Sequence, residues 1–117
     1  MRLDIKDKPR EFDSGTAKIK DCGKLHLGKN EMISLVTKSG REYDITAKDW
    51  GFYVSPSINV RLRKEGFRVA LVLNGEGRLF INAVERDKIK LFKKYLASQG
   101  SRMLCWLGEG KIEEDRL

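Results

Sequence analysis

An aromatic stretch followed by a helix start contains the residues of this chain best suited to chemistry. Trp50, Phe52 and Tyr53 lie within four positions, shortly before Ser55 and Pro56. Ser55 is a plausible N-cap and Pro56 a plausible first helical residue, because proline's missing N–H needs no partner there. A helix start offers unpaired N–H groups and a partial positive charge, which suit an anion. The residues expected to bind an anionic ligand are Trp50, Tyr53, Ser55, Ser57, Asn59 and Arg61.

An ordinary capped helix beside core aromatics is the competing interpretation, because every helix must cap its start. A regular strand would place Trp50 and Phe52 on one face and Tyr53 on the other. Gly51 favours a bend that interrupts this alternation. The sequence therefore leaves open whether the aromatic stretch faces a cleft or the core.

A second candidate site lies in residues 20–29, which are expected to form a loop because they contain two glycines. This segment holds the chain's only histidine and one of its two cysteines. A cysteine and a histidine that meet in space can form a thiolate nucleophile, whereas a metal site would need more ligands. A structural loop is the favoured interpretation, and no metal is expected. The residues of this candidate are Asp21, Cys22, Lys24 and His26.

Basic residues give the chain a net charge of +7. The excess is spread along the sequence rather than gathered in one tract, which weakens the case for nucleic acid. Lys88, Lys90, Lys93 and Lys94 fall on one predicted helix, but aromatic residues do not alternate with them as an RNA-stacking surface requires. A solvated helix face is the simpler interpretation.

The composition indicates a folded, charge-rich domain. The chain has 117 residues, of which 40% are apolar and 35% are charged. A chain of this size buries roughly two-thirds of its unfolded surface, enough for a core without metals or disulfides. We expect a single α+β domain over residues 15–107, with a charged, flexible leader over 1–14 and a flexible tail over 108–117.

The cysteines and the apolar runs favour a cytoplasmic protein. Cys22 and Cys105 are far apart, and residues 1–8 form no apolar signal segment. The longest aliphatic run, residues 69–73, is too short to span a bilayer. No membrane contact is expected, and the oligomeric state stays open.

Two hairpins and two helices account for most of the predicted domain. Alternating apolar residues predict strands over 31–37 and 41–46, with Gly40 in the turn. Apolar residues on both faces predict central strands over 67–73 and 78–84, and a similar strand over 103–107. The helices are expected at about 56–65 and 85–99, with glycine after each. These elements predict a mostly antiparallel sheet of about six or seven strands. The last strand could pair parallel with residues 78–84 as a right-handed crossover, and the strand order is left open.

Catalytic and cofactor motifs are missing from the sequence. It contains no GxxxxGK[ST], GxGxxG after a strand, HExxH, GxSxG or paired CxxC. No catalytic residue is assigned and no cofactor is expected, which favours a protein that is not an enzyme.

Three segments of the chain resemble a group of small uncharacterised bacterial proteins. They are GTAKIKDCGKLHLGKNEMISLVTKSGREYDITAKDWGFY, PSINVRL with the following GF, and the closing CWL. These proteins are encoded near genes for surface-polysaccharide and sialic-acid-type sugar synthesis. The resemblance covers residues 15–107 and implies a process, without assigning a role to any residue.

The favoured hypothesis is a small binding or accessory protein in surface-polysaccharide biosynthesis. Its partner would be an anionic sugar-type ligand or a biosynthetic enzyme. One alternative is a basic nucleic-acid-binding module that uses the lysine-bearing helix. A second alternative is a small enzyme that uses Cys22 and His26.

Overall fold

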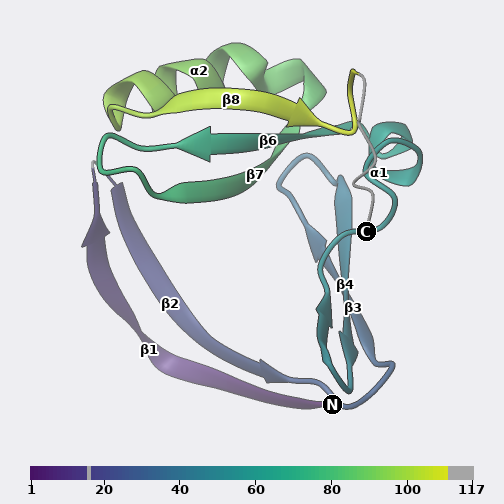
Figure 1. Ribbon diagram of the computed structural model, residues 1–117. Helices are drawn as coiled ribbons and strands as arrows, with labels where there is room; N and C mark the ends of the chain where they lie inside the picture. Colours follow the sequence, from purple (N-terminus) through teal and green to yellow (C-terminus); the bar gives the residue numbers. More distant parts are fainter. Residues whose placement is uncertain (16, 111–117) are drawn as a thin grey trace. The chain divides into compact units, whose positions relative to one another are not determined.

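The chain folds into eight strands in three small sheets, together with two α-helices (Figure 1). This computed structural model describes residues 1–15 and 17–110. The architecture is α+β with antiparallel sheets, as expected, but the single larger sheet is replaced by three. The chain divides into two compact units, residues 1–55 and residues 56–117. No helix in the described part of the chain has the length and apolar character of a membrane span.

The first sheet is a long two-stranded ribbon of β1 (Arg2–Ser14) and β2 (Ala17–His26). Residues 2–14, expected as a charged, flexible leader, form β1, and residues 20–26 of the expected loop 20–29 belong to β2, so only residues 27–29 lie outside a strand. Apolar residues also meet across the ribbon, because Leu3 lies opposite Leu25 and Phe12 lies opposite Ile19. Because charged residues separate these apolar residues, the sequence did not indicate the two strands.

The second sheet has the order β3 (Met32–Val36), β4 (Glu42–Lys48) and β5 (Gly51–Tyr53). The predicted hairpin is confirmed, with Ile33 opposite Ile45 and Leu35 opposite Tyr43. The residues that alternate with these apolar positions are mostly polar. One of them, Asp44, is nevertheless buried, and its carboxylate accepts a hydrogen bond of 2.6 Å from the Ser34 hydroxyl.

The third sheet has the order β7 (Leu79–Glu85), β6 (Phe67–Leu73) and β8 (Arg102–Leu107). The predicted hairpin of β6 and β7 is confirmed, but only β6 is central, since β7 lies at an edge. Strand β8 pairs with β6, antiparallel to it. It does not pair with β7, because β6 lies between them, so the parallel pairing considered for the last strand is wrong.

Helix α1 is much shorter than predicted and spans only Arg61–Lys64. Ser57 explains its late start, because the Ser57 hydroxyl and carbonyl accept hydrogen bonds from the backbone of residues 60–62. The β-branched Ile58 and Val60 also disfavour a helix here. The chain then turns at Gly66, whose φ is 89°.

The second predicted helix is present as a 3₁₀ turn, η1 (Arg86–Lys88), followed by α2 (Ile89–Ser98). It ends where the sequence predicts, at Gly100, which has a φ of 64°. Gly100 N–H donates to Ala97 O and Ser101 N–H donates to Leu96 O, the paired bonds of a Schellman motif.

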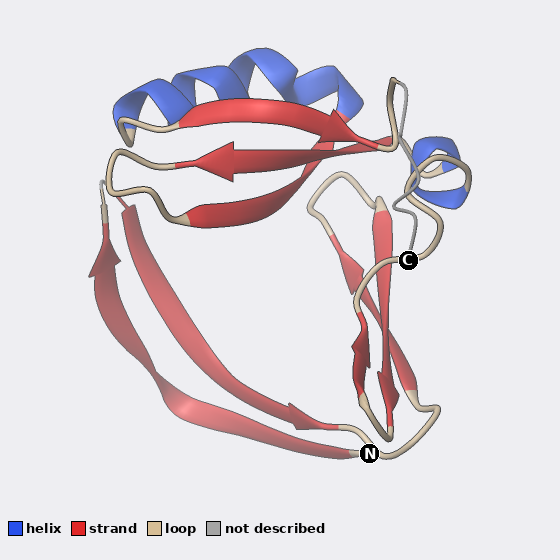
Figure 2. Cartoon of the chain, viewed as in Figure 1, coloured by secondary structure: helices blue, strands red, loops and turns tan. Residues whose placement is uncertain are grey.

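Side chains from both faces of β6 form the core of residues 56–110. Ala70 and Val72 pack with Leu96 of α2, and Phe92, Met103 and Trp106 pack around them. Figure 2 shows α2 lying along this sheet. The next residues along β6 alternate to the opposite face, where Phe67 and Val69 are buried and α1 contacts the strand. Residues 108–110 continue the described chain, and the rest of the predicted tail, 111–117, lies outside the described residues.

Candidate functional site

The predicted anion site is divided between the two compact units. Trp50 and Tyr53 belong to the first unit, where Trp50 lies in the β4–β5 turn and Tyr53 ends β5. Both side chains are exposed, as is that of Phe52, so the aromatic stretch does not enter the core. Asn59 and Arg61 belong to the second unit, beside and within α1.

The two serine hydroxyls of the predicted site are engaged with the chain itself. Ser55 Oγ forms a hydrogen bond with the Tyr43 hydroxyl. Ser57 Oγ accepts a hydrogen bond of 3.0 Å from the Arg61 N–H. Helix α1 has only four residues, so the aligned peptide dipoles that the prediction required are few.

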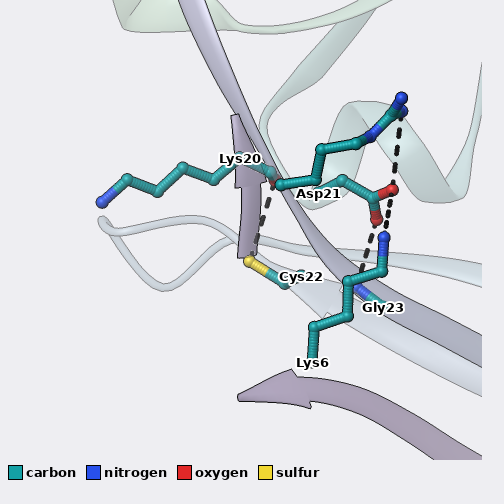
Figure 3. Close-up of polar contacts among 6 residues, drawn as sticks. Lys6, Lys20, Asp21, Cys22 and Gly23 are labelled. Atoms are coloured by element: carbon teal, nitrogen blue, oxygen red, sulfur yellow. Dashed lines mark hydrogen bonds and ion pairs between the residues drawn. The ribbon is translucent and has the colours of Figure 1, made fainter. Parts of the chain in front are cut away.

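Two residues of the second predicted site, Asp21 and Cys22, lie at an irregularity in the ribbon, and Figure 3 shows their polar contacts. Between the paired positions Ile5–Gly23 and Arg10–Asp21, β1 advances five residues while β2 advances two. The Asp21 carboxylate stabilises this bulge. It accepts hydrogen bonds from Lys6 Nζ at 2.9 Å and from the Gly23 N–H at 3.2 Å. The Lys6 hydrogen bond, followed by the Gly23 N–H, lowers the pKa of Asp21. Asp21 therefore has a structural role here.

The fold does not bring Cys22 and His26 together as a nucleophile and its base. They lie four positions apart on one extended strand, which separates their Cα atoms by roughly 13 Å. Cys22 Sγ donates to Lys20 O at 3.7 Å, and His26 Nε2 lies 3.1 Å from Arg2 Nη2. Lys24 is exposed on the same strand. Within residues 1–15 and 17–110, no group of three His, Cys, Asp or Glu side chains is placed to hold a metal ion.

A site that the sequence analysis missed is an arginine pocket, formed by Arg63, Arg68, Arg86 and Glu109. These side chains line an open depression of about 430 Å³. Arg63 comes from α1, Arg68 from β6 and Arg86 from η1, while Glu109 follows β8. The Arg86 N–H donates to Gly66 O at 2.8 Å, which joins the end of β7 to the turn before β6. This junction brings the three guanidinium groups together.

Arg68 is the most fixed member of the arginine pocket. Its Nε and Nη2 each donate to the Glu109 carboxylate at 2.9 Å, a bidentate arrangement. Its guanidinium also lies 4.0 Å from the ring centroid of Trp106. This stacking holds the guanidinium plane and covers one side of the charge with an aromatic face.

The positive charges of Arg63 and Arg86 are less fully balanced by Glu109 than that of Arg68. Arg63 Nη2 lies 3.5 Å from Glu109 Oε1, and its side chain is half exposed. The Arg68 hydrogen bonds, and then the charges of Arg68, Arg63 and Arg86, lower the pKa of Glu109. Arg63 and Arg68 pair with Glu109 and Arg86 lines the same depression, so three guanidinium groups face one carboxylate in the lining.

Replacing Glu109 by glutamine is expected to lower the free energy of unfolding by about 1–2 kcal/mol at pH 7. The carboxylate is only 24% exposed, so water screens this interaction weakly. Because the folded-state pKa lies below the usual value of 4.5, the stabilisation is present above pH 4.5 and is lost as the pH falls through the lowered pKa. Urea unfolding of the wild type and of Glu109→Gln between pH 7 and pH 3 measures the difference in their free energies of unfolding. We expect this difference to decrease toward zero as the pH falls.

Glu76→Gln is the matched control for Glu109→Gln. Glu76 pairs with Arg78 at 3.4 Å, but both side chains are largely exposed. Exposed pairs contribute little, so this variant should unfold like the wild type at every pH. A Glu109→Gln protein with unchanged stability at pH 7 would contradict the structural role of the carboxylate.

No protein-family model, curated protein sequence or solved structure matches the chain. The resemblance to bacterial proteins encoded near surface-polysaccharide genes therefore stays a prediction.

Proposed function

We propose that this protein is a small binding domain that recognises an anionic ligand in the arginine pocket. The observation that carries the proposal is the gathering of three guanidinium groups and one carboxylate, paired with two of them, around an open depression. Guanidinium groups match the geometry of carboxylate and phosphate, to which they donate two parallel hydrogen bonds. The resemblance found in the sequence favours an acidic sugar among such ligands.

Glu109 would compete with an anionic ligand for the arginine side chains. Its carboxylate already occupies the place that an anionic ligand would take on Arg68. An incoming carboxylate or phosphate would bind Arg63 and Arg86 first, because these two retain the most unmatched charge. It would then share Arg68 with Glu109 or displace Glu109.

Two substitutions are expected to change anion affinity in opposite directions. Arg86→Ala removes a positive group and should weaken binding about tenfold to hundredfold, the value of a hydrogen bond to a charged group. Glu109→Gln removes the competing negative charge and should strengthen binding. The probes are inorganic phosphate and N-acetylneuraminate, titrated at low salt because exposed charges are screened.

Trp106 provides the measurement, because Arg68 stacks on its ring. A Trp50→Phe background leaves Trp106 as the single tryptophan. Arg78→Ala is the matched control, since it removes the same charge from an exposed residue of the β6–β7 turn. The proposal is rejected if neither probe changes Trp106 fluorescence, or if Arg78→Ala weakens binding as much as Arg86→Ala.

A further inference from the structure

Helix α2 keeps two large apolar side chains in water after its core contacts are made. Leu96 is buried in the core and Phe92 packs against it, so these two residues mark the side of the helix that faces the sheet. Leu91 and Tyr95 lie outside that buried stripe, one helical turn apart. They are 65% and 50% exposed. Exposed apolar side chains gathered in one place are typical of an interaction surface.

Three lysines lie among these apolar residues on the same helix. Lys90, Lys93 and Lys94 are all exposed, and Lys94 follows Leu91 by three positions, the spacing at which helix side chains are neighbours. Helix α2 contains no acidic residue, and none of the three lysines forms an ion pair with a described residue. We call this surface the α2 outer face, which consists of Lys90, Leu91, Lys93, Lys94 and Tyr95.

The second unit as a whole is positively charged around the α2 outer face. Residues 56–110 contain eleven lysines and arginines but only five aspartates and glutamates, and they therefore carry +6 of the chain's net charge of +7. An uneven charge of this size attracts anionic partners and raises their concentration near the protein. The partner of the α2 outer face is therefore expected to be negatively charged.

The surface of an anionic lipid bilayer matches both kinds of side chain on the α2 outer face. Lipid phosphates attract the lysines, while the boundary between headgroups and acyl chains accepts a leucine and the ring of a tyrosine. Lysine side chains are long enough to keep their ammonium groups among the headgroups while apolar neighbours lie deeper. A nucleic-acid backbone would match the lysines but would offer nothing apolar to Leu91. The exposed Leu91 and Tyr95 therefore favour the bilayer.

We propose that the α2 outer face binds this protein to the surface of bilayers that contain anionic lipids. Helix α2 lies parallel to the bilayer, with Leu91 and Tyr95 at the acyl boundary and its lysines at the level of the phosphates. Each lysine near an anionic surface strengthens binding about fivefold, so the three together contribute about a hundredfold. Binding of this kind needs no segment that spans the bilayer. It uses no residue of the arginine pocket.

Sedimentation of the full chain with lipid vesicles tests the role of charge. One vesicle is pure phosphatidylcholine, and the other has two parts phosphatidylcholine to one part phosphatidylglycerol. We expect at least tenfold tighter binding to the anionic vesicle, and a smaller difference at about 1 M salt, where the screening length falls to about 3 Å. The triple variant Lys90→Gln, Lys93→Gln, Lys94→Gln should bind the anionic vesicle about a hundredfold more weakly.

A matched control removes the same charge from another part of the chain. Three lysines of β2 are also exposed, and their replacement lowers the net charge by the same amount. This control should keep its affinity for the anionic vesicle within about threefold of the wild type, because lysines away from the bilayer contribute little. The control substitutions are Lys18→Gln, Lys20→Gln and Lys24→Gln.

Leu91→Ala tests the apolar part of the surface. It should weaken binding to the anionic vesicle about tenfold, because the leucine side chain is buried at the acyl boundary. Ile81→Ala is the control and should stay within about twofold, since Ile81 is 63% exposed and lies opposite Leu71, on the sheet face turned away from α2. In bicelles of the same anionic mixture, a spin-labelled lipid should broaden the amide signals of Leu91 and Tyr95 more than that of Ile81.

Thermal unfolding of these variants should match the wild type, because the replaced side chains are exposed. The proposal is overturned if the wild type binds the anionic vesicle no better than the neutral one, or if the β2 control loses as much affinity as the α2 triple variant. Duplex DNA binding that the α2 triple variant loses, without binding of anionic vesicles by the wild type, would assign the surface to nucleic acid and also overturn it. Phosphate binding in the arginine pocket is a separate measurement, since the α2 triple variant retains every residue of that pocket.

Discussion

Replacing Gly23 by alanine is expected to separate the two strands of the β1–β2 ribbon. Gly23 has a φ of 137°, a conformation that residues with a side chain rarely adopt. An added Cβ would lie 2.1 Å from Asp4 O and 2.9 Å from the Ile5 Cα on the facing strand. Both neighbours are backbone atoms, so rotation of a side chain cannot relieve the clash.

Gly51→Ala is the matched control, because it has the same conformation without the crowding. Its φ is 142°, and nothing lies within 4 Å of the position of an added Cβ. This variant should therefore carry only the backbone strain, on the order of 1–3 kcal/mol. Cross-strand nuclear Overhauser effects between β1 and β2 should be lost in Gly23→Ala and retained in Gly51→Ala. Retention of these signals in both variants would contradict the close approach of the strands.

Replacing Leu62 by alanine is expected to lower the free energy of unfolding by about 2–5 kcal/mol, the usual effect of truncating a fully buried leucine. Leu62 has 0% of its surface exposed and is one of the two largest fully buried side chains of the described chain. Helix α1 has only four residues and its N-cap residue, Val60, makes no side-chain cap bond, so its own hydrogen bonds hold it weakly. Burial of Leu62 must therefore supply most of the free energy that holds α1 against the sheet.

Leu79→Ala is the control for Leu62→Ala, since Leu79 is a leucine of the same unit that is 61% exposed. We expect its free energy of unfolding to stay within about 0.5 kcal/mol of the wild type. Urea unfolding measures both variants. Similar losses in the two proteins would mean that Leu62 is not part of a packed core.

Local patterns predict the hairpins and the end of α2 well, because their causes are local. Gly40 marks the β3–β4 turn, alternation sets the register of Ile33 with Ile45, and Gly100 closes α2. The predicted start of α1 at Pro56 is wrong, and the reason is again local. The Ser57 hydroxyl accepts a hydrogen bond from the Arg61 N–H, which outweighs the preference of proline for the first turn of a helix. The ribbon was missed because its few apolar residues are separated by charges and by the irregular register around Asp21.

The spacing of residues in the sequence cannot predict the arginine pocket. Arg63, Arg68 and Arg86 belong to three different elements, and a hydrogen bond between Arg86 and Gly66 brings them into one place. Glu109 joins them after a further helix and strand. The sequence shows a chain with excess positive charge, but the local concentration of that charge follows from the pairing of β6 with its neighbours.

The order of strands in the third sheet has a consequence for how the chain folds during synthesis. Every pairing in the described chain joins strands adjacent in sequence, except that of β6 with β8. This pairing closes a loop across β7 and α2, and such distant contacts form more slowly than hairpins. Strand β8 also leaves the ribosome after all the others. Until residues 102–107 are made, one edge of β6 stays unpaired and Ala70 and Val72 lack the cover of Met103 and Trp106. The nascent chain is therefore most open to aggregation in the interval between the synthesis of α2 and that of β8.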